Sequence, residues 1–145
     1  MADIERRANA LWRGDLRSGR GEMSSTSGAL KGTAYAFATR FEQAPGTNPE
    51  ELIAAAHAAC FSMAFANTLA SKGHVPESIE TQATCTLSIG PGGAKITRMH
   101  LQTHGRVSNL DASEFERIAK EAEGNCPVSN LLRPGCQITL EAKLL

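Results

Sequence analysis

One continuous apolar segment, rich in alanine, sets the strongest constraint on what this chain can fold into. Asn48 is a good helix N-cap, and Pro49 suits the first position of a helix. Apolar residues and alanines then continue without a helix breaker as far as Ser71 and Lys72. Gly73 follows as the expected residue after a helix C-terminus. The pattern predicts one long, buried central helix that begins at Pro49 and ends at Ser71 or Lys72.

Composition and charge argue against two classes of partner. A transmembrane span requires about 20 strongly apolar residues, whereas this segment contains His57, Ser62, Asn67 and Thr68. We therefore expect no membrane partner. The formal net charge is zero, so the basic excess that binds nucleic acid is absent. No signal-peptide pattern opens the chain, which predicts the cytoplasm, where thiols stay reduced.

The patterns outside the long helix predict an α+β domain. Alternating and β-prone stretches are separated by glycine-rich turns, whereas two later segments have helical spacing and capping residues. The other predicted elements are strands at residues 8–12, 22–26, 35–41, 78–89, 95–107 and 137–144, and helices at residues 111–124 and 125–132. The strands at 78–89 and 95–107 are expected to form a long hairpin. No repeats or linkers interrupt the chain, so a single domain over residues 1–145 is expected.

Two of the four cysteines have surroundings that could support chemistry. Cys60 lies in the middle of the long helix, where a thiol is usually inert and receives no help from the helix N-terminus. Cys126 precedes Pro127 at a helix start, where free N–H groups stabilise a thiolate. Electrostatics alone therefore make Cys126 the more acidic of the two. Cys85 belongs to the apolar face of a strand and Cys136 lies in a turn, so neither is a candidate. A buried, inert thiol remains the alternative for each candidate.

Other polar residues near Cys60 have two interpretations each. His57 shares a helix face with Cys60 and could hold a metal with it, but no further ligand pair accompanies them. We therefore favour a packing histidine and predict no metal. Glu50 and Glu51 open the long helix and complement its dipole. Glu51 also fills the capping-box position, which leaves Glu50 available for another role.

Motifs along most of the chain resemble those of one known family. They are Asn48-Pro-Glu-Glu-Leu52, Ala58-Ala-Cys-Phe61 and, 66 residues after Cys60, Cys126-Pro-Val-Ser129. In this order and at this separation they resemble the OsmC/Ohr family of thiol-dependent hydroperoxide reductases. Two further stretches, Trp12-Arg-Gly-Asp15 and Tyr35-Ala-Phe-Ala-Thr-Arg-Phe41, resemble the OsmC (osmotically inducible protein C) branch rather than the Ohr branch. The resemblance implies an OsmC/Ohr-like α+β fold, with antiparallel sheets wrapped around long central helices in an intertwined homodimer.

The resemblance also implies an activity and roles for individual residues. It implies a peroxidase that reduces organic hydroperoxides to alcohols in oxidative or osmotic stress defence, without a metal or other cofactor. Cys60 would become a sulfenic acid, and Cys126 would resolve it as a Cys60–Cys126 disulfide. An arginine, Arg40 or alternatively Arg20 as in the Ohr branch, and Glu50 would assist Cys60. Dithiol groups, such as those of lipoylated proteins, are the implied reductants.

Physical chemistry adds expectations about the geometry of such a site. A guanidinium stays charged and would lower the pKa of Cys60, and Glu50 could orient it. Ten residues of helix, about 15 Å, separate Glu50 from Cys60, so we expect each active site to be shared between two antiparallel chains. Phe61, Met63 and Phe65 are expected to line it and to favour alkyl or lipid hydroperoxides over hydrogen peroxide. Ordinary packing in the core is the alternative for each of these three residues.

Three alternatives remain open at this level. The main one is a redox sensor or binding protein that uses the same disulfide without turnover. The second is a metal protein that uses His57 and Cys60. The third exchanges the roles of the thiols and makes Cys126 the nucleophile.

Overall fold

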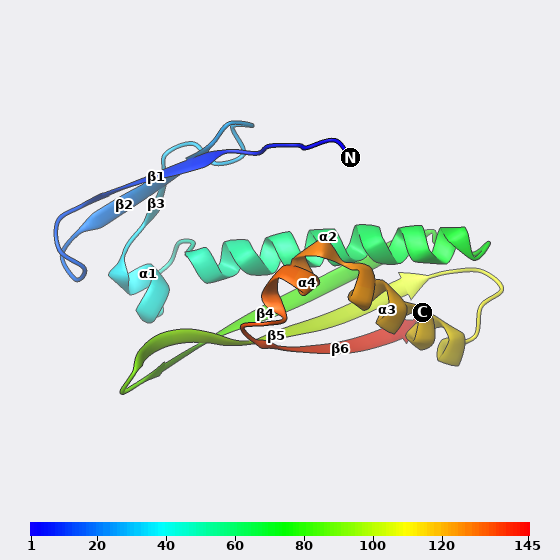
Figure 1. Ribbon diagram of the computed structural model, residues 1–145. Coiled ribbons are helices and arrows are strands. Elements are labelled where there is room, and N and C mark those ends of the chain that lie inside the picture. The colour runs from blue at the N-terminus through cyan, green and yellow to red at the C-terminus, as the bar shows by residue number, and fades with distance from the viewer. The chain divides into compact units, whose positions relative to one another are not determined.

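The computed structural model describes residues 1–145, which divide into two compact units, residues 1–49 and 50–145 (Figure 1). Each unit contains one three-stranded sheet, and helices accompany both sheets. The predicted α+β class is therefore confirmed. The expectation of a single domain stays a prediction.

The first unit is a small antiparallel sheet followed by one helical turn. Its elements are β1 (Ala8–Arg13), β2 (Arg20–Ser25), β3 (Thr33–Tyr35) and α1 (Phe37–Phe41). The prediction of a strand over residues 35–41 is wrong, because the strand ends at Tyr35 and α1 follows. The Thr39 hydroxyl accepts the Ala36 N–H and donates to the Ala36 carbonyl, both at 3.0 Å, which turns the chain into the helix. The Phe37 and Phe41 rings are 4.9 Å apart, as the i, i+4 spacing of a helix requires.

The second unit is built on α2 (Pro49–Ser71), whose predicted bounds are confirmed. The helix ends in a Schellman motif, in which the Gly73 N–H donates to Ala70 and the His74 N–H donates to Leu69, both over 3.0 Å. Gly73 has a φ of +87°, a conformation that favours glycine. By length and composition α2 could also cross a membrane, a test that core helices of soluble proteins pass equally.

The sheet of the second unit has the order β4-β5-β6, with β4 (Ser78–Gly90), β5 (Gly93–Arg106) and β6 (Gln137–Leu144). The predicted β4–β5 hairpin is confirmed. The expectation of purely antiparallel sheets is wrong, because β6 pairs with β5 in parallel. The chain crosses over between these strands through α3 (Ala112–Asn125) and α4 (Pro127–Leu132), as a parallel pair requires.

The core of the second unit lies between two helices and one face of its sheet, and Figure 1 shows α2 lying along that sheet. It consists of fully buried residues from α2, β5, α3 and the turn after α3: Phe61, Phe65, Leu69, Leu101, Phe115, Ile118, Ala119, Ala122 and Cys126. Hydroxyl groups add a polar link at its edge, where Ser62 donates to Thr81 and Thr81 bonds Thr103, both over 2.9 Å. The core packing of Phe61 and Phe65 holds the middle of α2 against the sheet.

Candidate functional site

The two candidate cysteines lie next to each other. Cys126 separates α3 from α4, caps α4 at its N-terminus and is fully buried. Cys60 is partly buried in the middle of α2 and packs against the core cluster that contains Cys126. Cys126 lies close enough to Cys60 to raise the pKa of its thiol, and both thiols are free. Figure 1 shows α4 beside α2, an arrangement that brings together two thiols 66 residues apart in the sequence.

The surroundings of Cys60 favour its neutral thiol. Burial raises the pKa of Cys60, and the neighbouring Cys126 raises it further through a hydrogen bond and its charge. The backbone N–H of Val128 acts in the opposite direction and lowers this pKa by hydrogen bonding. Val128 is the second residue of α4, so the N-terminus of α4 assists Cys60. Its own helix offers Cys60 no such help, so this contribution comes from a second helix of the same unit. All of these influences come from within the unit of residues 50–145.

An open hollow adjoins Cys60. Its volume is about 500 Å³. It is lined by Cys60, Met63, Ala64, Asn67, Thr68, Asn125 and Pro127. Of the three residues predicted to contact substrate, Met63 lines this hollow and is 76% exposed, whereas Phe61 and Phe65 are fully buried in the core. The hollow gives a small molecule access to the Cys60 side of the thiol pair.

His57 lies one helical turn before Cys60 and is fully buried. Its Nε2 lies 2.7 Å from the Oγ of Ser129 on α4, whereas its Nδ1 has no hydrogen-bond partner. Burial lowers the pKa of His57, and the charge of Arg133 acts in the same direction while Glu123 opposes it. His57 is therefore a neutral packing histidine with a side-chain partner, as the sequence indicated. The structure places no group of three metal-ligating side chains anywhere in the chain.

Glu50 lies far along α2 from Cys60. The helix is continuous between them, which sets them about 15 Å apart within one chain. Glu50 is 7% exposed and lies close enough to Cys85 of β4 to raise the pKa of that thiol, although burial of Cys85 is the larger cause. One chain alone therefore does not bring Glu50 to Cys60.

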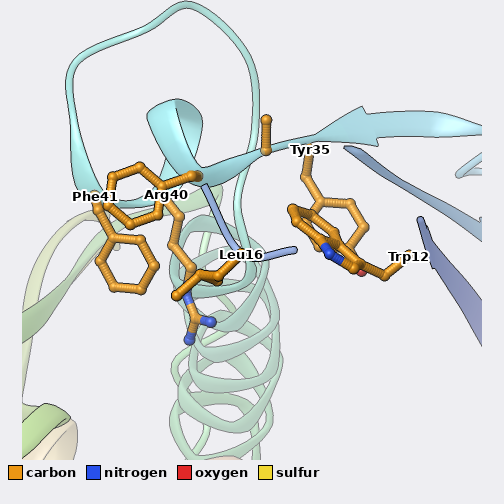
Figure 2. A pocket seen from close by; sticks show the side chains of 7 residues that line it. Trp12, Leu16, Tyr35, Arg40 and Phe41 are labelled. Atoms are coloured by element: carbon orange, nitrogen blue, oxygen red, sulfur yellow. The ribbon is translucent and has the colours of Figure 1, made fainter. Parts of the chain in front are cut away.

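Arg40 belongs to an aromatic pocket inside the first unit, which the sequence did not predict. The pocket has a volume of about 310 Å³. Figure 2 shows Trp12 and Tyr35 on one side, Phe41 on the other, and Arg40 and Leu16 between them. The Arg40 guanidinium lies 5.2 Å from the centre of the Phe41 ring, a cation–π contact. The pocket thus combines apolar walls with one permanent positive charge.

A glycine makes room for the rings of this pocket. Gly21 of β2 is the register partner of both Trp12 and Tyr35, whose rings are 5.4 Å apart. A Cβ on Gly21 would lie 2.4 Å from the Tyr35 ring, so no other residue fits without displacement. The only tryptophan and the only tyrosine of the chain flank this glycine, a signal that could have revealed the pocket. Arg20, the alternative to Arg40, is exposed on β2 and does not line the pocket.

Comparisons with known proteins match this arrangement to one family. The family model described as OsmC-like protein matches residues 42–141. The chain is 45% identical over 141 residues to peroxiredoxin OsmC of Escherichia coli K12, which covers 97% of each chain. It is 36% identical to the organic hydroperoxide resistance protein OhrA of Bacillus subtilis, over 78% of this chain and 76% of that protein. An organic hydroperoxide resistance protein OsmC from Legionella pneumophila has a similar crystal structure, with a TM-score of 0.72, 26% identity and full coverage of both chains.

Proposed function

The chain belongs to the OsmC family, and on this premise we propose that it is a thiol peroxidase that reduces organic hydroperoxides in stress defence. The proposal rests on the pair of free, neighbouring thiols, Cys60 and Cys126, and on the open hollow that adjoins Cys60. Two of its relatives are named peroxiredoxin and organic hydroperoxide resistance protein, which agrees with a peroxidase.

The proposed reaction uses the two thiols in sequence. The Cys60 thiolate attacks the distal oxygen of the hydroperoxide, the O–O bond breaks, and the leaving alkoxide takes a proton to become an alcohol. Cys60 is thereby oxidised to a sulfenic acid. The Cys126 thiol then attacks the Cys60 sulfur, which forms the disulfide and releases water. An external dithiol, for example the dihydrolipoyl group of a protein in the cytoplasm, reduces the disulfide and restores both thiols.

Activation of Cys60 requires a cation, because burial raises its pKa. We assign this role to Arg40, whose guanidinium can hydrogen-bond to both sulfur and peroxide, with Glu50 orienting it. Because Glu50 and Cys60 of one chain are about 15 Å apart along α2, we propose that two chains share each site. Supporting this, α2 is apolar but leaves a row of side chains exposed: Ala55, Ala56, Ala59, Met63 and Ala70. Small side chains allow a second helix to approach closely in a two-fold dimer.

We propose organic hydroperoxides as substrates because apolar groups surround the assigned residues. Met63 and Ala64 line the hollow beside Cys60, and aromatic rings line the pocket that contains Arg40. An alkyl or aryl tail gains free energy from such burial, about 25 cal/mol per Å² of apolar surface, whereas hydrogen peroxide has no tail to bury. Phe61 and Phe65 are fully buried in the core, so we assign them no substrate contact.

The proposed function is tested by following consumption of cumene hydroperoxide with dihydrolipoate as reductant. We expect many turnovers per chain in the wild type, none in Cys60→Ser, and a higher kcat/KM for cumene hydroperoxide than for hydrogen peroxide. Oxidation that stops after one equivalent would instead support the redox sensor. Trapping with dimedone should find the sulfenic acid on Cys60 in a Cys126→Ser variant. A sulfenic acid on Cys126 in Cys60→Ser would exchange the two roles.

Site sharing is tested by mixing two inactive variants. In a mixed dimer of Cys60→Ser and Glu50→Gln chains, a shared arrangement leaves one site with an intact Cys60 and an intact Glu50. Refolding the two chains together should therefore restore activity, with up to half of the sites intact in each mixed dimer. No recovery despite mixed dimers would place Glu50 and Cys60 of each site on the same chain.

A further inference from the structure

The pair His57 and Ser129 lies parallel to the pair Cys60 and Cys126. His57 precedes Cys60 by three residues on α2, and Ser129 follows Cys126 by three residues at the start of α4. The Nε2–Oγ distance of 2.7 Å therefore joins the same two helices, one turn away from the thiols. Both polar side chains are fully buried, so this hydrogen bond is not weakened by competition with water.

The hydrogen bond between His57 and Ser129 joins two neutral groups. His57 is neutral, so one ring nitrogen carries a proton and the other does not. The Nε2 and the Ser129 Oγ are bonded in either tautomer, with Nε2–H donating to Oγ or Oγ–H donating to Nε2. A neutral hydrogen bond, rather than a charge, therefore fastens α4 to α2.

The remaining contacts of α4 lead back to α3. The Asn130 amide donates to the Gly124 carbonyl over 3.0 Å, and Arg133 pairs with Glu123 at 2.7 Å. These contacts hold α4 to the end of α3 but leave its position relative to α2 to the core packing of Val128, to the Val128 N–H beside the Cys60 sulfur and to the buried His57–Ser129 hydrogen bond. Since α4 is a helix of only six residues, a single strong contact can determine where its first turn lies.

We propose that the His57–Ser129 hydrogen bond is a positioning device for disulfide formation, which keeps Cys126 beside Cys60 while the two sulfurs are not bonded. This proposal rests on the proposed function and assigns His57 and Ser129 as positioning residues. Attack of Cys126 on the Cys60 sulfenic acid forms one S–S bond and releases water, and its rate depends on how often the sulfurs are in reach. The His57–Ser129 hydrogen bond and the Cys60–Cys126 disulfide join the same two helices. Loss of the hydrogen bond should therefore lower the effective concentration of the Cys126 thiol at Cys60.

The kinetic test compares Ser129→Ala with the wild type after one equivalent of cumene hydroperoxide. We expect Cys60 to be oxidised at a rate within about 2-fold of the wild type, because the hydrogen bond does not touch the peroxide. Disulfide formation should be about 10-fold slower, equivalent to about 1.4 kcal/mol, and excess peroxide should convert more Cys60 to the sulfinic acid. Ser62→Ala is the matched control. It removes a hydrogen bond that joins α2, near Cys60, to Thr81 of β4, and it should leave the rate of disulfide formation unchanged. His57→Gln, which can place an amide N–H near the Nε2 position, should restore resolution relative to His57→Leu.

An equilibrium test separates this proposal from the proposed function. In glutathione redox buffers, the effective concentration of the Cys60–Cys126 thiol pair should fall about 10-fold in Ser129→Ala and stay constant in Ser62→Ala. This measurement requires no peroxide. Unchanged effective concentration and unchanged resolution in Ser129→Ala would overturn the positioning role. A wild type that forms the disulfide readily but never consumes hydroperoxide would refute the peroxidase and leave the positioning role intact.

Discussion

Oxidation of Cys60 and Cys126 to a disulfide should stabilise the fold by an amount set by the chain between them. The disulfide would close a loop of 66 residues. The chain-entropy relation for a cross-link of this length gives about 4 kcal/mol at 25 °C. The two thiols are already neighbours in the reduced protein, so their bonding should require little rearrangement and cost little of this gain in strain.

The measurement is a pair of urea unfolding curves, for reduced and oxidised protein at one protein concentration. For a chain of this size the slope of unfolding free energy against urea is about 2 kcal/mol per M. A gain of about 4 kcal/mol therefore moves the midpoint up by about 2 M. The same oxidant should leave the midpoints of Cys60→Ser and Cys126→Ser unchanged. A Cys85→Ser variant should show the full shift, because Cys85 is not assigned to the pair.

Two results would refute this reasoning. A shift of less than about 1 kcal/mol would mean that the disulfide strains the folded state or that the unfolded state is already compact. A shift that survives in Cys60→Ser, or that disappears in Cys85→Ser, would show that oxidation joins other cysteines than the pair that the structure brings together.

Three further predictions concern the core, the buried histidine and the arginine. A Cβ at Gly105 would lie 2.6 Å from the Phe115 ring, so Gly105→Ala should lower the free energy of unfolding by about 1–3 kcal/mol. Gly124 has open space around it on α3, so Gly124→Ala should raise the free energy of unfolding by up to about 1 kcal/mol. Urea unfolding curves measure both changes. Because burial lowers the pKa of His57, the unfolded chain binds a proton there more readily than the folded chain. The contribution of neutral His57 to the free energy of unfolding is therefore fully present above about pH 6.5 and is lost as the pH falls below that value. His57→Gln should therefore flatten the dependence of the urea midpoint on pH between about 5 and 7. Arg40→Met should slow the oxidation of Cys60 by cumene hydroperoxide about 10- to 100-fold, measured by stopped flow, and an unchanged rate would remove Arg40 from the mechanism.

Local signals in the sequence were sufficient for most of the helices and strands. The Asn48-Pro49 start and Gly73 fixed the ends of α2, because these positions need a capping side chain and a residue that tolerates positive φ. The direction of β6 was not predictable in the same way. Its pattern of alternating residues is identical for parallel and antiparallel pairing, and only the crossover through α3 and α4 decides between them.

The site was predictable as a set of residues but not as a geometry. Motifs identified Cys60 and Cys126, because their sequence surroundings are distinctive. The contact between His57 and Ser129 joins residues 72 positions apart, and no local pattern couples them. For Phe61 and Phe65 the sequence instead predicted a contact that the structure does not contain. Their proximity to Cys60 in the sequence predicted substrate contacts, but successive helix positions point in different directions and both rings face the core.

The position of Cys60 in the middle of a helix, which first argues against reactivity, is explained by α4. Cys126 occupies the N-cap of that helix and Pro127 its first position, which has no N–H to offer. The first free N–H of α4 is therefore that of Val128, and it acts on the sulfur of Cys60. The same six-residue helix thus supplies both the resolving thiol and a donor that favours the Cys60 thiolate.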